Sequence, residues 1–478
     1  MTDLVALLEQ RADAIALRVG GHDFTWSAVG AAADRLAAAA DSTAGRPAAR
    51  LALSTSEPLV AAAALVAALR SGRTLILLHP RLTAAERGTL ALRAAADLLV
   101  TDEGLGCDDA LSHLVLSPAH LTAGPVPPLR RAPSGEPLLL LFTSGTTGPP
   151  KGAMLSAEAL AAAAAASSER LATGPDDRWL ACMPLSHIGG ISILVRALHD
   201  GFVVVAQSGF RAPAVAAALH DERITRLSLV PTMLRDLLDA GAMPPSTLRT
   251  LLLGGAAAPP GLVREAVTGG WPVATTYGLT EAAAQVTTAT PQETEADPQS
   301  SGHPLPGYRL RISEPDADGI GQVEVAAPSL MVGYRGDDEA TRAAVRDGWL
   351  RTGDLGSLLP DGQLCLVARR TDLIVSGGEN IYPAEVEAAV RDAFPHLHDL
   401  CVVGLASERW GQEVALLLVA GTEQPPALAA LRSALTGRLA AFKMPRHLRQ
   451  VAALPRTPAG KLDRVAAAAA FDGRPPQT

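Results

Sequence analysis

The chain has 478 residues, of which 48% are hydrophobic, 19% are charged and 3% are aromatic. This length exceeds one ordinary domain, and the composition is typical of a globular enzyme whose core is filled by Ala, Leu and Val. A net charge of −8 without a Lys/Arg-rich run argues against a nucleic-acid-binding protein.

The cysteines and the N-terminal residues indicate the compartment. Cys107, Cys182, Cys365 and Cys401 lie far apart and form no CxxC pair, which argues against a zinc ribbon or a disulfide framework. The N-terminus does not have the pattern of a signal peptide, and the apolar run at 59–69 is too short to span a bilayer. We therefore expect a cytoplasmic protein with free thiols and no membrane partner.

The first 300 residues alternate short apolar runs with longer helical patterns. The predicted strands are 75–78, 98–100, 138–142, 203–205, 228–230 and 251–253, and the predicted helices are 58–69, 84–95, 157–171, 212–220 and 233–240. This alternation indicates α/β layers with largely parallel sheets.

The pattern changes after about residue 300. Short strands at 308–312, 321–325 and 363–367, joined by Gly/Asp/Pro turns, indicate a β-rich subdomain. The chain then restarts with strands at 372–375, 400–404 and 414–419 and helices at 383–393 and 427–439. The predicted fold class is α/β, with a large N-terminal domain (1–368) of layered α/β subdomains plus the β-rich subdomain. A small, mobile α+β C-terminal domain (369–478) follows.

A loop rich in Thr, Ser and Gly follows the predicted strand 138–142. It contains Thr143, Ser144, Gly145, Thr146, Thr147 and Gly148 and leads through two prolines to Lys151. Glycines let the backbone approach phosphate oxygens, consecutive N–H groups can form an anion-binding nest, and Lys adds a positive charge. A Walker A loop requires Gly directly before Lys and Ser or Thr after it. Here Pro150 precedes Lys151 and Gly152 follows it, which excludes that motif.

This stretch resembles the phosphate loop of the acyl-adenylate-forming, or AMP-binding, enzyme superfamily. Further motifs of that superfamily follow in the same order over nearly the whole chain. The resemblance implies that the chain binds ATP and Mg²⁺ and activates a carboxylic acid as its acyl-adenylate.

A second motif combines an aromatic ring, a hydroxyl and a carboxylate within five residues, Tyr277 to Glu281. The resemblance implies that Tyr277, followed by Gly278, stacks on adenine. It also implies that Thr280 contacts the α-phosphate or the acyl carbonyl and that Glu281 holds Mg²⁺, for which a single carboxylate beside substrate phosphates is sufficient. The turn containing Gly255 and Ala256 resembles the segment that lines the adenine and acyl sites.

Three further positions are placed by the resemblance. His187 is expected near the acyl carboxylate, without a role as general base because that carboxylate is already ionised at pH 7. Asp354 is expected to accept the ribose hydroxyls, with Arg369 beside it. The hinge position, often Asp or Lys in relatives, is Thr371 here, so the chemistry of the hinge departs from the family pattern.

The C-terminal domain carries two more motifs. Gly377, Gly378 and Glu379 resemble the loop that lines the pantetheine tunnel of coenzyme A in acyl-CoA ligases. Lys461, on a loop held by Gly and Pro, resembles the family's catalytic lysine, which bridges the α-phosphate and the carboxylate during adenylation. The two motifs serve different steps, so the resemblance implies that the small domain rotates about the hinge.

The acid and the acceptor are inferred from local stretches. No carrier domain follows in the sequence, which favours free coenzyme A. The stretches 184–196, 277–288 and 372–383 resemble the ligase branch that acts on 2-succinylbenzoate in menaquinone biosynthesis. That acid has two carboxylates, and Arg196 and Arg235 are both candidates to hold the one that does not react. The alternatives are a ligase for another aryl or medium-chain acid, or a relative that binds nucleotide or acyl groups without catalysis. A homodimer is expected only because such enzymes often form one.

Overall fold

The computed structural model describes residues 2–106, 111–131, 137–143, 150–256, 258, 260–315, 319–368, 374–381, 383–397, 399–419, 426–455 and 464–471. The chain forms two compact units. The first comprises Met1–Pro80, Arg87–Phe142 and Gly152–Val367, and the second comprises Arg81–Glu86, Thr143–Lys151 and Ala368–Thr478. None of the described helices is both long enough and apolar enough to cross a membrane.

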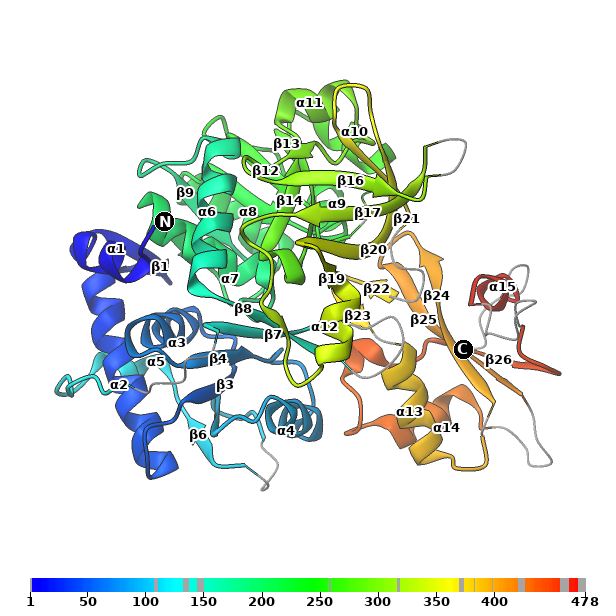
Figure 1. The fold of residues 1–478 in the computed structure, drawn as a ribbon, viewed down its shortest axis with the longest axis horizontal. Coiled ribbons are helices and arrows are strands. Elements are labelled where there is room, and N and C mark those ends of the chain that lie inside the picture. The colour runs from blue at the N-terminus through cyan, green and yellow to red at the C-terminus, as the bar shows by residue number, and fades with distance from the viewer. Residues whose placement is uncertain are drawn as a thin grey trace. The chain divides into compact units, whose positions relative to one another are not determined.

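One sheet has the strand order β18-β8-β7-β4-β3-β5-β6. Figure 1 labels its strands β8, β7, β4, β3 and β6. Its strands are β3 (Arg50–Ser54), β4 (Thr74–Leu77), β5 (Leu98–Thr101), β6 (His113–Val115), β7 (Leu139–Thr143), β8 (Lys151–Leu155) and β18 (Gly333–Tyr334). The pairings from β7 across to β6 are parallel, and β18 pairs antiparallel with β8. The buried apolar runs of β4, β5 and β7 match the strands predicted there.

The first unit contains a second sheet with the order β15-β14-β13-β12-β11-β9-β10-β1-β2. Its strands are β1 (Ile15–Val19), β2 (His22–Thr25), β9 (Arg178–Ala181), β10 (Val203–Ala206), β11 (Arg226–Leu229), β12 (Thr250–Leu253), β13 (Val273–Leu279), β14 (Ala284–Thr288) and β15 (His303–Pro304). From β13 to β1 the pairing is parallel, and both edges are antiparallel.

Two hydrophobic cores cover opposite faces of this second sheet. The larger core includes helices α2 (Trp26–Ala44), α3 (Pro58–Ser71), α6 (Ala157–Leu171) and α7 (Ile188–Asp200). The smaller includes α8 (Ala212–Asp221), α9 (Pro231–Asp239) and α10 (Pro260–Thr268). Side chains of a strand alternate between faces, so in β9 Trp179 and Ala181 belong to the larger core and Leu180 to the smaller. Trp179 therefore faces the side on which α7 packs.

Shorter elements complete the described chain. They are α1 (Leu4–Gln10), α4 (Ala84–Arg93), α5 (Pro118–Thr122), α11 (Pro291–Ala296), α12 (Asp338–Ala344) and the 3-10 turns η1 (Thr280–Ala282) and η2 (Ala441–Lys443). An antiparallel sheet is built from β16 (Arg309–Ser313), β17 (Gly321–Ala326), β19 (Val345–Arg346), β20 (Trp349–Leu358) and β21 (Leu364–Ala368), as the β-rich prediction required.

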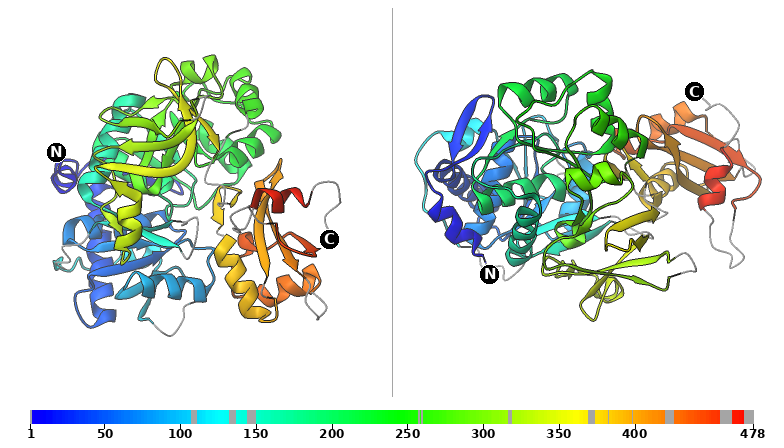
Figure 2. Two further views of the ribbon diagram at one scale, coloured as in Figure 1. Left: turned by 45° about the vertical axis from the view of Figure 1, so that its right-hand side comes forward. Right: turned by 90° about the horizontal axis from the view of Figure 1, so that it is seen from above.

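The second unit contains a mixed sheet with helices on both faces (Figure 2). Its strands are β22 (Ile374–Ser376), β23 (Glu379–Ile381), β24 (Leu400–Ser407), β25 (Gly411–Val419) and β26 (His447–Val451), and its helices are α13 (Pro383–Ala393), α14 (Leu428–Leu435) and α15 (Arg464–Ala469). The helix predicted at 427–439 ends at Leu435, because the next residue, Thr436, is extended with φ −63° and ψ 130°. The predicted fold class is confirmed.

Candidate active site

Tyr277 lies near the end of β13, where the strand changes partners. The β13 strand pairs parallel with β12 as far as Thr275 and then antiparallel with β14. Only glycine fits at position 278, because a Cβ there would lie 1.8 Å from the carbonyl oxygen of Ala284. The buried Tyr277 hydroxyl donates a hydrogen bond of 2.6 Å to Oδ2 of Asp354 on β20. Two predicted site residues that are 77 positions apart are therefore in direct contact.

Thr280 and Glu281 lie on η1, directly after β13. The Glu281 side chain is buried, and the Tyr334 hydroxyl donates to its Oε1 at 2.9 Å. A buried carboxylate needs hydrogen bonds or a cation, and its oxygens are suitable ligands for Mg²⁺. The next residues, Ala283 and Ala284, have positive φ angles of 54° and 101°. Such backbone costs about 1–3 kcal/mol per residue, and strained residues of this kind cluster at active sites.

The predicted glycine turn follows β12. A Cβ at Gly254 would lie 2.5 Å from Cγ2 of Thr276, and Gly255 has a left-handed φ of 78°. These two positions therefore require glycine, and without side chains they leave the backbone open to close approach by a ligand. Ala256 follows directly in the same turn.

His187 is the N-cap residue of α7 and is half-buried. Its ring centroid lies 5.2 Å from that of His79, and its backbone N–H donates to the Pro184 carbonyl oxygen at 3.2 Å. The first turn of α7 is pressed against the same loop, because a Cβ at Gly190 would lie 2.2 Å from the Pro184 carbonyl oxygen.

Arg196 lies on α7 and is buried, with an exposed fraction of 3%. Its Nη1 donates to Oε1 of Gln285 at 2.6 Å and to Oγ of Ser167 at 3.2 Å, and its Cζ lies 4.3 Å from the ring centroid of Trp179. Burial lowers the pKa of Arg196 to about 10, so the guanidinium remains charged at pH 7. In the part of the chain that the structure describes, this guanidinium makes no ion pair with a carboxylate.

A small cavity lies beside Arg196, between α6, α7 and the turn after η1. Leu160 and Ser167 line it from α6, Ser192 from α7, and Ala284 and Gln285 from the start of β14. It has room for about one water molecule. The cavity therefore places the strained turn after Glu281 and the buried charge of Arg196 around one space.

The loop predicted for coenzyme A lies in the second unit, between β22 and β23. Gly377 and Gly378 have left-handed φ angles of 60° and 83°. The Gly377 N–H donates to the Trp410 carbonyl oxygen at 2.8 Å, and a Cβ at Gly377 would lie 3.0 Å from the Trp410 ring. The buried Glu379 carboxylate forms an ion pair with Arg81.

Part of the predicted phosphate site is described. Thr143 ends β7 and Lys151 begins β8, and the Thr143 hydroxyl donates to the Lys151 carbonyl oxygen at 3.5 Å. The other predicted residues, Ser144, Gly145, Thr146, Thr147, Gly148, Arg369, Thr371 and Lys461, lie outside the described residues.

Sequence reasoning missed the partners that hold the predicted residues. Tyr334 follows a glycine in a two-residue strand and carries no local motif. Gln285 lies only four positions after Glu281, inside the stretch 277–288 that resembles the 2-succinylbenzoate ligase branch. Its contact with Arg196 spans 89 positions and is visible only in the tertiary structure.

The chain is similar to known proteins over most of its length. The family model "AMP-binding enzyme" matches residues 5–335, and the model "AMP-binding enzyme C-terminal domain" matches residues 385–461. A 2-succinylbenzoate–CoA ligase from Bacillus mycoides (strain KBAB4) is 38% identical over 341 residues, which cover 69% of each chain.

Solved structures of o-succinylbenzoate CoA synthetase from Bacillus subtilis are also similar. A double mutant bound to the product analogue OSB-NCoA is 30% identical, has a TM-score of 0.91 and covers 99% of each chain. The complex with the acyl-adenylate OSB-AMP is 29% identical, with a TM-score of 0.74, and covers 100% of this chain and 99% of that one. The complex with ATP and magnesium is 30% identical, with a TM-score of 0.72, and covers 96% of this chain and 98% of that one. The chain belongs to the AMP-binding enzyme family.

Proposed function

We propose that this chain is an ATP-dependent acid–CoA ligase that converts 2-succinylbenzoate to its coenzyme A thioester, a step of menaquinone biosynthesis. The relatives named above act on this acid or bind its derivatives. The observation that carries the proposal for this chain is the buried, charged Arg196 beside the cavity next to η1. A buried cation without a carboxylate partner is costly, and a substrate with a second carboxylate supplies that partner.

The sequence left two arginines as candidates for the second carboxylate, and the contacts support Arg196. Arg235 is partly exposed and pairs with Glu265 at 2.7 Å and Asp239 at 3.5 Å. Hydrogen bonding to Glu265 raises the pKa of Arg235. The Arg235 guanidinium is therefore already paired with carboxylates at the surface, whereas the Arg196 guanidinium donates to the neutral groups of Ser167 and Gln285.

In the first half-reaction, the substrate carboxylate attacks the α-phosphorus of ATP and pyrophosphate leaves. We assign Tyr277, with Gly278, Gly255 and Ala256, to the adenine side and Asp354, with Arg369, to the ribose. Thr143–Gly148 and Lys151 hold the phosphates, Glu281 holds Mg²⁺, and His187 lies at the acyl carboxylate. Negative charge grows on the phosphoryl oxygens, so Lys461 and Thr280 act by electrostatic stabilisation. Bound Mg²⁺ neutralises charge on the phosphate oxygens as pyrophosphate leaves.

In the second half-reaction, the thiol of coenzyme A attacks the acyl carbon of the adenylate and AMP leaves. We assign Gly377, Gly378 and Glu379 to the pantetheine side of this step. We further propose that the functional boundary lies between the N-terminal domain 1–368 and a mobile C-terminal domain 369–478. The second domain then carries a residue for each half-reaction, Lys461 for the first and the Gly377 loop for the second.

A substrate panel tests the proposed function. The chain is incubated with ATP, Mg²⁺, coenzyme A and one acid, and AMP release and thioester formation are measured. We expect turnover with 2-succinylbenzoate at a kcat/KM at least about tenfold, or 1.4 kcal/mol, above benzoate and octanoate. Turnover with benzoate or octanoate but not with 2-succinylbenzoate would show that the chain acts on another acid. The absence of AMP release with every acid would indicate a binding protein without catalysis.

A further inference from the structure

The guanidinium of Arg196 is surrounded by three uncharged side chains, Ser167, Gln285 and Trp179, which we call its cage. Because a guanidinium only donates hydrogen bonds, its partner atom on Gln285 is the amide oxygen, at 2.6 Å from Nη1. The Ser167 hydroxyl donates to the same oxygen at 2.6 Å. Trp179 supports the guanidinium plane from one side, and the Trp179 indole N–H is fixed by Ser228 Oγ at 3.0 Å. Cation–π contact and neutral acceptors can hold a cation without cancelling its charge.

Burial lowers the pKa of Arg196 and the nearby charge of Asp200 opposes this shift, but Asp200 makes its hydrogen bonds to other residues. Asp200 lies one turn after Arg196, and its Oδ2 accepts hydrogen bonds from Ser168 and Thr173, both at 2.6 Å. Its other oxygen, Oδ1, lies 2.7 Å from Nδ1 of His199. Among the described residues, the buried Nε of Arg196 has no hydrogen-bond partner. In the described part of the chain the guanidinium thus keeps one donor for a further ligand and forms no hydrogen bond with a carboxylate.

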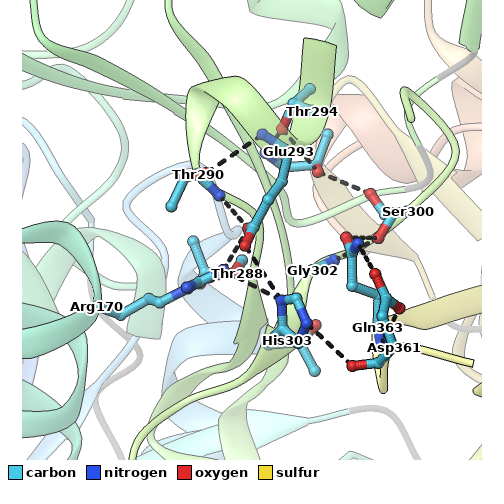
Figure 3. Close-up of polar contacts among 12 residues, drawn as sticks. Arg170, Thr288, Thr290, Glu293, Thr294, Ser300, Gly302, His303, Asp361 and Gln363 are labelled. Atoms are coloured by element: carbon cyan, nitrogen blue, oxygen red, sulfur yellow. Dashed lines mark hydrogen bonds and ion pairs between the residues drawn. The ribbon is translucent and has the colours of Figure 1, made fainter. Parts of the chain in front are cut away.

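The cage is fixed by the strands and helices that carry it. Gln285 Nε2 donates to Thr288 Oγ1 at 2.7 Å, which orients the amide. Figure 3 shows the far end of β14, where Arg170 of α6 donates to the Thr288 carbonyl oxygen at 2.8 Å and pairs with Glu293 of α11. The Arg170 contact joins α6, which carries Ser167, to β14, which carries Gln285. This contact therefore links the two elements that carry the hydrogen-bond partners of Arg196.

We infer that Gln285 is a specificity-determining residue: its neutral amide positions Arg196 while leaving the guanidinium charge free for the non-reacting carboxylate of a two-carboxylate substrate. A carboxylate at the same position would form a buried ion pair with Arg196 and match its charge internally. The substrate carboxylate would then have to compete with that pair. This inference deepens the proposed function and rests on it, because it assumes that Arg196 faces the substrate.

The test is the isosteric substitution Gln285→Glu in the full chain. Adenylation is followed by ATP–pyrophosphate exchange with 2-succinylbenzoate and with two analogues that each lack one carboxylate, 3-benzoylpropionate and 2-butanoylbenzoate. The analogue that the wild type activates serves as the one-carboxylate probe. We expect the KM for 2-succinylbenzoate to rise about 10- to 100-fold, with kcat little changed and kcat/KM for the probe within about threefold of wild type.

Two matched variants separate positioning from folding. Gln285→Met keeps the length of the side chain but adds no charge, so we expect a smaller loss of preference for the two-carboxylate acid than in Gln285→Glu. In an Arg196→Met background, Gln285→Glu should leave the ratio of kcat/KM for 2-succinylbenzoate to kcat/KM for the probe unchanged, because the guanidinium that Gln285 positions is absent. A variant that unfolds would lose activity with both acids together, and thermal melting curves would reveal the unfolding.

The outcomes distinguish the two claims. If the wild type does not prefer 2-succinylbenzoate to the one-carboxylate analogue, the proposed function fails. The inference about Gln285 is overturned if the wild type shows that preference and Gln285→Glu retains it. It is also overturned if Gln285→Glu is folded but loses activity with both acids equally.

Discussion

At the scale of single residues, the first unit holds two buried charges in opposite ways. Glu281 receives a hydrogen bond from the Tyr334 hydroxyl at 2.9 Å, which orients its buried carboxylate. Arg196 is held by neutral acceptors and by the Trp179 ring. The first arrangement orients a carboxylate that we propose as the Mg²⁺ ligand, and the second surrounds a guanidinium that we propose as the partner of a substrate carboxylate.

Removing the Tyr334 hydroxyl tests this arrangement at Glu281. In Tyr334→Phe the ring remains buried but the carboxylate loses a donor, and hydrogen bonds to charged groups contribute about 1.5–3 kcal/mol. We expect the Mg²⁺ concentration for half-maximal pyrophosphate exchange to rise about 10-fold or more, because a carboxylate that is no longer oriented is a poorer ligand. The KM for 2-succinylbenzoate should change little. An unchanged Mg²⁺ dependence in a folded variant would show that Tyr334 does not position Glu281.

At the scale of elements, sequence patterns predicted what is local. The helix predicted at 157–171 is α6 (Ala157–Leu171), because an apolar helical pattern is bounded by Ser156, whose side chain caps the first turn. Helix α7 (Ile188–Asp200) was not predicted as a helix. Its first turn contains Gly189 and Gly190, which are poor helix formers.

In the candidate site, the sequence likewise predicted the residues of a local motif but not the contacts between distant residues. Tyr277, Thr280 and Glu281 could be predicted because they form one short motif in the sequence. The contact between Tyr334 and Glu281 spans 53 positions, and packing rather than local pattern creates it. The neutral surroundings of Arg196 were equally hidden, so the sequence could not distinguish it from Arg235.

The first turn of α7 offers a matched test of element packing. A Cβ at Gly190 would meet the Pro184 carbonyl oxygen at 2.2 Å, whereas a Cβ at Gly189 would meet only Cε of Met183 at 3.6 Å. We expect Gly190→Ala to destabilise the protein by about 1–3 kcal/mol through overpacking. Gly189→Ala should be neutral or stabilise by up to about 1 kcal/mol through helix propensity. Thermal unfolding of the two variants side by side checks this, and equal melting temperatures would contradict the close approach at Gly190.

At the scale of the whole molecule, the proposed chemistry places two steps on one small domain. Lys461 belongs by resemblance to adenylation, and the loop at Gly377 belongs to thioester formation. The Gly377 loop depends on Trp410, which accepts its backbone hydrogen bond and packs against it. A residue for each step can therefore be changed within the same domain.

We expect Lys461→Ala and Trp410→Leu to impair opposite steps. Loss of a charge that stabilises the transition state costs about 10²- to 10³-fold, so Lys461→Ala should reduce pyrophosphate exchange by that factor. It should still convert added acyl-adenylate and coenzyme A to thioester at a rate near that of the wild type. Trp410→Leu should keep pyrophosphate exchange within about threefold and slow the thioester step by about 10-fold or more, since the turn at Gly377 loses its packing partner. If either variant were folded and slowed both steps equally, the two residues would not act in separate half-reactions. The proposed division of the small domain between the two steps would then be wrong.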